Sequence, residues 1–179
     1  KEIEDVAKRV EELLRESSRE VEEVLREVEE LVRRSTRRNE EAVRRVRKSN
    51  KELEDEVRRS NRSEDIKRRV KEIVEESKRL LEESSKRNRD IAEEIRKLLE
   101  TIKRLNDEMV RRLKELVKKG GEDVKTLLDE AKRLVDRSRE LLERLLRDVR
   151  RLIKESDKIT RELERKNEKL LKEVKEEID

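Results

Sequence analysis

The sequence predicts an all-α protein, a long, nearly straight up-down-up three-helix bundle that forms a single domain over residues 1–179. Apolar residues recur along almost the whole chain at the three-and-four spacing of one helix face. No proline interrupts this pattern, and the only two glycines are adjacent, at Gly120 and Gly121. The hydrophobic fraction of 30% is about two residues in every seven, which is the density of a narrow helical seam.

The first helix is expected over about residues 2–60, because its apolar stripe is continuous and contains neither Gly nor Pro. At 1.5 Å per residue this helix would be roughly 85 Å long. Asn61 suits the left-handed position after a helix C-terminus, and Ser63 suits the cap of the next helix. A connection this short makes the two helices antiparallel neighbours.

The second helix is expected over about 64–119 and the third over about 122–178. Gly120 and Gly121 supply the turn between them, and the acidic pair that follows favours the positive end of the third helix. The three helices would be nearly equal in length, as a bundle with flush ends requires. Their stripe advances by close to 3.6 residues per step, which predicts little supercoiling.

Ser, Thr and Asn residues interrupt the apolar stripe at positions that face the core. A polar group there costs about 1–3 kcal/mol unless it finds a hydrogen-bond partner, so partners are expected on the other helices at the same height. Folding at the two connections sets position i of the first helix near roughly 126 minus i on the second. The same position lies near roughly i plus 121 on the third.

Under this rule the polar residues fall into three layers that all three helices share. The middle layer contains Ser35, Thr36, Asn39, Ser84, Ser85, Asn88, Ser156 and Thr160. A second layer, toward the glycine connection, contains Ser17, Ser138, and Thr101 or Asn106. The third layer, toward the Asn61 connection, contains Ser49, Asn50, Ser77 and Asn167. Such layers make wrong registers costly; the alternative is that these residues lie at the edge of the seam, solvated and inert.

Composition argues against catalysis and metal binding. The chain has no His and no Cys, so it lacks the usual base for a serine nucleophile, the His of di-metal bundles and any thiolate ligand. Carboxylate pairs such as Glu11/Glu12 and Glu82/Glu83 have a basic residue one turn away and suit a solvated face. We therefore expect no enzyme activity, no catalytic residue, no cofactor and no metal.

The charge pattern and hydropathy bear on partners. No apolar run approaches the ~18 residues of a membrane span and no targeting signal is seen, so a soluble protein without a membrane partner is expected. The 53 basic and 49 acidic residues are interleaved. The one basic run, within residues 33–48, has the charge for nucleic-acid binding but no stacking aromatics or groove-reading motif. A solvated face is favoured, and no nucleic-acid partner is expected.

Three features of the whole chain resemble de novo designed helical bundles with buried hydrogen-bond networks. These features are the aligned polar layers in a Leu, Ile and Val core, the surface of Glu, Lys and Arg, and the equal helices with short connections. The resemblance implies a structural scaffold whose polar layers specify register and topology, with no required partner. The alternative is a designed interaction module that pairs with a partner helix or as a homodimer, through a flank formed by Leu14, Leu25, Leu146 or Val110.

Overall fold

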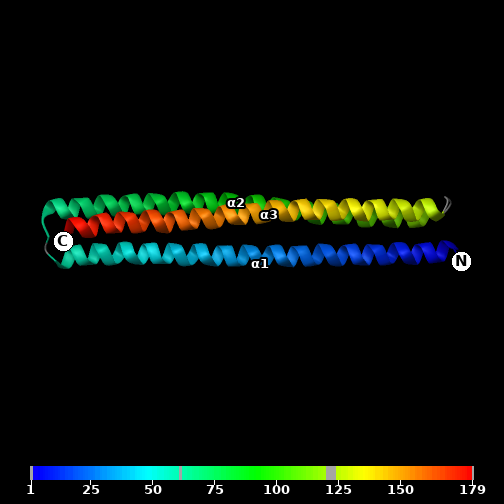
Figure 1. The fold of residues 1–179 in the computed structure, drawn as a ribbon, viewed down its shortest axis with the longest axis horizontal. Coiled ribbons are helices and arrows are strands. Elements are labelled where there is room, and N and C mark those ends of the chain that lie inside the picture. The colour runs from blue at the N-terminus through cyan, green and yellow to red at the C-terminus, as the bar shows by residue number, and fades with distance from the viewer. Residues whose placement is uncertain (1, 61, 120–123, 179) are drawn as a thin grey trace. The chain divides into compact units, whose positions relative to one another are not determined.

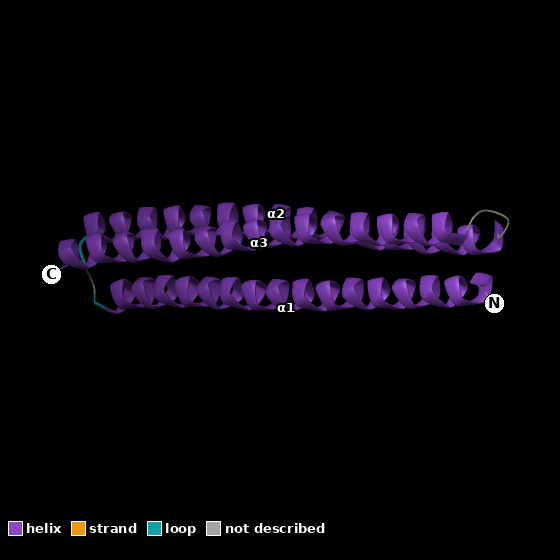
Figure 2. Cartoon of the chain, turned by 45° about the vertical axis from the view of Figure 1, so that its right-hand side comes forward, coloured by secondary structure: helices purple, strands orange, loops and turns teal. Residues whose placement is uncertain are grey.

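The computed structural model describes residues 2–60, 62–119 and 124–178, which form an all-α three-helix bundle (Figure 1). Helix α1 spans Glu2–Arg59, α2 spans Glu64–Lys119 and α3 spans Val124–Ile178, with 58, 56 and 55 residues. The described chain is helical almost throughout (Figure 2). The predicted fold class and the nearly equal helix lengths are therefore confirmed.

The connection between α1 and α2 ends where the sequence predicts. The carbonyl of Ser63 accepts the first helical hydrogen bond of α2, from the amide of Lys67 at 3.1 Å, which is the N-cap position. An acidic first turn follows, where negative side chains favour the positive end of the helix. The roles predicted for Asn61 and for residues 120–123 lie outside the described residues.

The chain divides into two compact units, and each is built from a stretch of all three helices. Unit 1 comprises Lys1–Leu31 and Glu94–Arg151. Unit 2 comprises Val32–Glu93 and Leu152–Asp179. That residues 1–179 form one domain with nearly straight helices stays a prediction.

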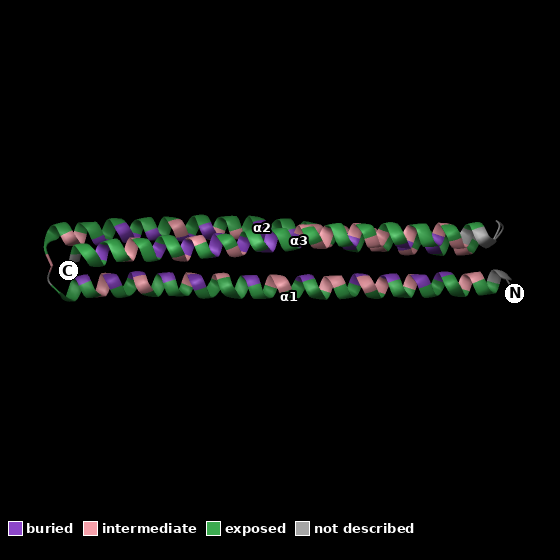
Figure 3. Cartoon of the chain, viewed as in Figure 1, coloured by how far each residue is buried: buried purple, intermediate pink, exposed green. Residues whose placement is uncertain are grey.

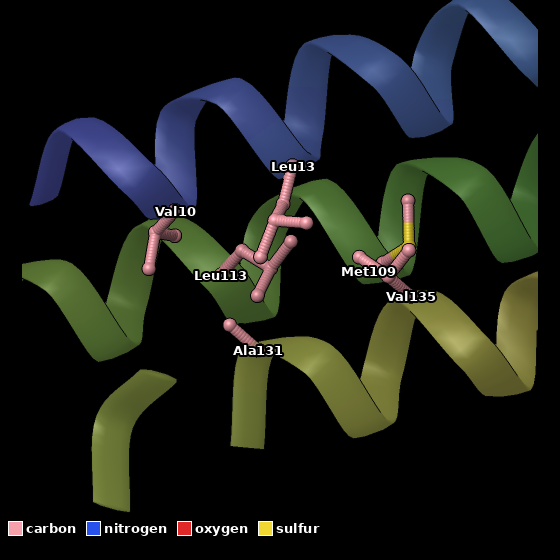
Figure 4. Packing of buried hydrophobic residues seen from close by; sticks show 6 residues of the cluster. All are labelled: Val10, Leu13, Met109, Leu113, Ala131 and Val135. Carbon is pink, nitrogen blue, oxygen red and sulfur yellow. The ribbon is translucent and has the colours of Figure 1, made fainter. Parts of the chain in front are cut away.

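The core of unit 1 contains two hydrophobic clusters to which every helix contributes. One takes two buried residues from each helix: Val10, Leu13, Met109, Leu113, Ala131 and Val135 (Figure 4). The other takes one from each helix: Val21, Ile102 and Leu142. From the first cluster to the second, residue numbers rise along α1 and α3 and fall along α2. Within unit 1, α2 is therefore antiparallel to α1 and α3, which is the predicted up-down-up order.

The core of unit 2 follows the same plan. Its larger cluster contains the buried residues Leu53, Val57, Val70, Ile73, Val74 and Val174. A smaller one contains Val46, Leu81 and Leu163. Along each helix the buried and half-buried positions recur on one side and the exposed positions on the other (Figure 3). Most of the exposed residues are charged. None of the described helices has an apolar stretch long enough to cross a membrane.

Candidate functional site

One side chain from each helix of unit 2 joins a buried hydrogen-bond chain. Asn50 Nδ2 donates to Ser77 Oγ at 2.7 Å, and Ser77 Oγ donates to Asn167 Oδ1 at 2.5 Å. The three residues are 5%, 1% and 3% exposed. The Ser77 hydroxyl thus accepts from α1 and donates to α3. Asn50 Oδ1 has no hydrogen-bond partner in the described structure, and Ser49, the other predicted member of this layer, is half-buried.

The predicted middle layer also connects three helices. Ser35 Oγ donates to Ser156 Oγ at 3.4 Å, and Ser156 Oγ donates to Asn88 Oδ1 at 2.8 Å. One turn along α3, the Thr160 hydroxyl lies 3.2 Å from Asn39 Oδ1 and 3.1 Å from the Ser156 carbonyl oxygen. Because a hydroxyl has one proton, Thr160 donates to one of these two acceptors at a time.

A carboxylate that the sequence pattern did not single out belongs to the middle layer. Asp157 Oδ1 lies 3.1 Å from Ser35 Oγ, and because the Ser35 hydroxyl has one proton, it donates either to this oxygen or to Ser156 Oγ at a time. Asp157 Oδ2 accepts a hydrogen bond from Arg38 Nη2 at 2.8 Å. The Asp157 side chain is only 18% exposed, whereas that of Arg38 is 50% exposed. Arg38 therefore covers the solvent side of the layer with a charge-assisted bond. The offset rule pointed one residue away, at Ser156, but a charged residue was assigned to the surface.

Other polar groups of the predicted middle layer have no hydrogen-bond partner among the described residues or lie nearer the surface. Ser84 is 5% exposed, yet its hydroxyl has no hydrogen-bond partner in the described structure. The same holds for Nδ2 of Asn88. Ser85 is half-buried, and Thr36 is exposed, so placing Thr36 in the layer was wrong. At 3.6 residues per turn, Thr36 lies about 100° around α1 from the buried Ser35, which turns it away from the core.

The predicted second layer, in unit 1, does not form a network across the helices. Ser17 is 1% exposed, and its hydroxyl donates to Met109 Sδ, a weak acceptor, at 3.5 Å. The Thr101 hydroxyl donates to the backbone carbonyl one turn earlier in its own helix, at 3.0 Å. Asn106 Oδ1 is buried without a partner in the described structure, and Ser138 is half-buried. Ser17 thus pairs with a sulfur atom that the sequence pattern had assigned to the apolar stripe.

The hydrogen bonds between α1 and α3 follow the predicted offset within unit 2. Ser35 and Ser156 are 121 residues apart, and so are Asn39 and Thr160. Ion pairs between these two helices have similar separations, from 119 to 123 residues, in both units: Arg38–Asp157, Arg45–Glu164, Glu20–Arg139 and Glu27–Arg150. Surface pairs therefore share the register of the buried layers.

Two of these ion pairs perturb an arginine. Hydrogen bonding and, secondarily, the negative charge of Glu164 raise the pKa of Arg45 above its ordinary value. Glu20 raises the pKa of Arg139 in the same way, with smaller effects from Asp136 and Glu16. Arginine is already charged in any folded protein, so these shifts make no switch near neutral pH.

The described side chains hold no group of three or more His, Cys, Asp or Glu residues arranged to bind a metal ion. No protein-family model, curated protein or solved structure matches the chain significantly. The candidate site is the pair of polar layers in unit 2, and its chemistry is the pairing of hydroxyl and carboxamide groups across helices.

Proposed function

We propose that the chain is a de novo designed structural scaffold whose buried polar layers specify the register and topology of its three helices. The hydrogen-bond chain Asn50–Ser77–Asn167 carries this proposal, because it takes one buried side chain from each helix. Sliding one helix past the others separates these partners and sets polar groups against Val and Leu. Each buried polar group left unpaired in this way costs about 1–3 kcal/mol.

A designed origin is supported by agreement between the levels of the sequence. Charged residues make up 57% of the chain and aromatic residues 0%, unlike average globular domains with about 25% charged residues. The apolar period, the caps, the helix lengths and the polar offsets all favour the same bundle, as a design procedure requires. The lack of any matching protein supports the same proposal.

The register role is tested by replacing the layer and measuring distances between helices of unit 2. Spin labels are attached at Lys48→Cys on α1 and Lys158→Cys on α3, in a chain that has no cysteine of its own. With the layer intact, pulsed electron resonance should give one narrow distance distribution. The triple change Asn50→Leu, Ser77→Leu and Asn167→Leu should keep the chain helical but broaden or split that distribution, because leucine does not distinguish one register from another.

A matched control replaces the same number of polar residues in unit 1. The control variant carries Ser17→Leu, Thr101→Leu and Asn106→Leu, which replace side chains that do not bond to one another. The distance distribution between spin labels at Arg26→Cys and Lys132→Cys should therefore stay as narrow as in the parent. If a unit 2 variant that also carries Ser35→Leu, Asn88→Leu and Ser156→Leu keeps a distribution as narrow as that of the parent, the polar layers do not specify register and the proposal is wrong.

A second function, a designed interaction module, is supported by incompletely covered leucines in unit 1. Half-buried leucines line an opening between α2 and α3: Leu105, Leu134, Leu141 and Leu145. The residues expected to form an exposed flank, Leu14, Leu25, Leu146 and Val110, are half-buried rather than exposed, and Leu14 and Leu25 pack against the core clusters. Several of these leucines pack against the core clusters with part of the side chain, and the remaining apolar surface is what a module that binds another helical surface would cover.

A further inference from the structure

Unit 1 has an apolar groove between α2 and α3, which we call the basic groove. Its walls include the half-buried Leu134, Leu141 and Leu145, and its volume is about 80 Å³. Its charged lining consists of Arg112, Arg137 and Glu108, a net charge of +1. The groove therefore combines apolar walls with a slightly positive rim.

A second groove of unit 1, between α1 and α3, has the opposite charge, and we call it the acidic groove. Its volume is about 360 Å³, and its apolar lining includes the half-buried Val24 and Leu146. Its charged lining has four carboxylates and one guanidinium, a net charge of −3: Glu20, Glu23, Glu27, Glu143 and Arg139. Two of the carboxylates are already paired, since Arg139 Nε lies 2.9 Å from Glu20 Oε2 and Arg150 Nη2, from outside the lining, lies 2.6 Å from Glu27 Oε1.

We propose that the occupant of the basic groove is a second copy of this chain, docked through its acidic groove. The two grooves carry opposite net charge and each has apolar residues to bury, whereas pairing basic with basic or acidic with acidic sets like charges together. Two helix pairs placed face to face form a four-helix arrangement whose core comes from both grooves. This inference names the partner of the interaction module proposed above and rests on that second function.

The contact is head-to-tail, because it joins two different surfaces. Each copy has both grooves in unit 1, and α3 contributes to each through residues 134–146. Such a contact leaves one groove of each kind free at the ends of a dimer, so association continues into a ring or an open chain. It also weakens as salt screens the facing charges.

The test reverses charge in one groove at a time. Arg112→Glu with Arg137→Glu changes the basic groove from +1 to −3, and Glu23→Lys with Glu143→Lys changes the acidic groove from −3 to +1. Sedimentation velocity at low salt should show the parent mass rising with concentration. Each double variant should associate at least tenfold more weakly. The variant with all four changes has complementary grooves again and should recover association.

A matched control reverses two exposed charges in unit 2, Lys48→Glu and Lys86→Glu, and should associate like the parent. Circular dichroism verifies that every variant remains helical. The proposal is overturned if the parent keeps a mass of 21.8 kDa at all concentrations. It is also overturned if both double variants still associate like the parent, or if the variant with all four changes does not recover association. A constant monomer mass leaves the register role untouched, because spin-label distances within one chain test that role separately.

Discussion

The buried polar side chains of unit 2 bond across helices, with Ser84 as the exception among the described residues. Those of unit 1 bond to a sulfur atom, to their own helix or to nothing in the described structure. Asn50 and Asn167 meet at the Ser77 hydroxyl in unit 2. In unit 1 the equally buried Ser17 meets the thioether of Met109. The Ser77 and Ser17 hydroxyls are thus equally buried, but their hydrogen-bond partners differ. A polar residue specifies an arrangement only when another polar residue lies at its height.

The largest difference between the units should appear when one buried hydroxyl is removed from each. Ser77→Ala leaves Asn50 Nδ2 and Asn167 Oδ1 buried without their partner and should lower the free energy of unfolding by about 2–4 kcal/mol. Ser17→Ala loses only a bond to a weak acceptor and should cost about 0.5 kcal/mol or less. Denaturant unfolding followed by circular dichroism measures both. Equal losses would show that the partner does not matter.

Replacing an asparagine by leucine should change the free energy of unfolding in opposite directions in the two units. Asn88→Leu removes the acceptor of the Ser156 hydroxyl and should destabilise unit 2 by about 1–2 kcal/mol while loosening its register. Asn106→Leu removes a buried oxygen without a described partner and should stabilise the chain by about 1 kcal/mol. Thermal unfolding and the dispersion of amide chemical shifts measure these effects. An Asn88→Leu variant with both properties unchanged would show that Asn88 belongs to the surface.

A third substitution tests whether stability depends on the hydrogen-bond partner of a buried hydroxyl or on the unit in which the hydroxyl lies. Ser84 is buried in unit 2 but its hydroxyl has no partner in the described structure. Ser84→Ala should therefore leave the free energy of unfolding unchanged or raise it by up to about 1 kcal/mol, unlike Ser77→Ala in the same unit. The comparison uses the same denaturant assay. A loss as large as that of Ser77→Ala would mean that every buried hydroxyl of unit 2 contributes alike.

The smallest effect is expected at the surface. The side chains of Glu20 and Arg139 are 39% and 42% exposed, although Arg139 Nε lies 2.9 Å from Glu20 Oε2. A double-mutant cycle with Glu20→Ala and Arg139→Ala should give a coupling of about 0.2–1 kcal/mol at low salt. This coupling should shrink at high salt because solvent-exposed charges are screened. A coupling that is independent of salt would contradict this expectation.

Helix bounds and the offset between α1 and α3 were predictable because both depend on a period that repeats along the chain. The pair Asn39–Thr160 has the predicted separation of 121 residues. Individual partners were less predictable, because one residue of rotation separates the buried Ser35 from the exposed Thr36. Sequence position gives the height of a side chain on a helix, while its hydrogen-bond partner depends on its rotamer and on the facing residue.

Two residues that the sequence pattern did not identify as hydrogen-bond partners have side chains that fit more than one class. Met109 belongs to the apolar stripe and is 5% exposed, yet its sulfur accepts the Ser17 hydroxyl. The pattern places Asp157 among the surface charges, yet its carboxylate is a hydrogen-bond acceptor for the Ser35 hydroxyl in the middle layer. A pattern that sorts residues into apolar, polar and charged classes does not register a weak acceptor or a half-buried carboxylate.

The placement of Met109 gives unit 1 a chemical indicator of its own accessibility. It is the one methionine in a chain without cysteine, so peroxide has a single sulfur to oxidise. That sulfur lies inside a cluster to which all three helices contribute, and Met109 also lines the basic groove, so the reagent reaches the sulfur from the groove or when the cluster opens. The rate at which the intact chain gains one oxygen, followed by mass spectrometry, therefore reports the accessibility of this part of unit 1 without any label. Once formed, the sulfoxide places a polar group in that cluster and favours the opened state.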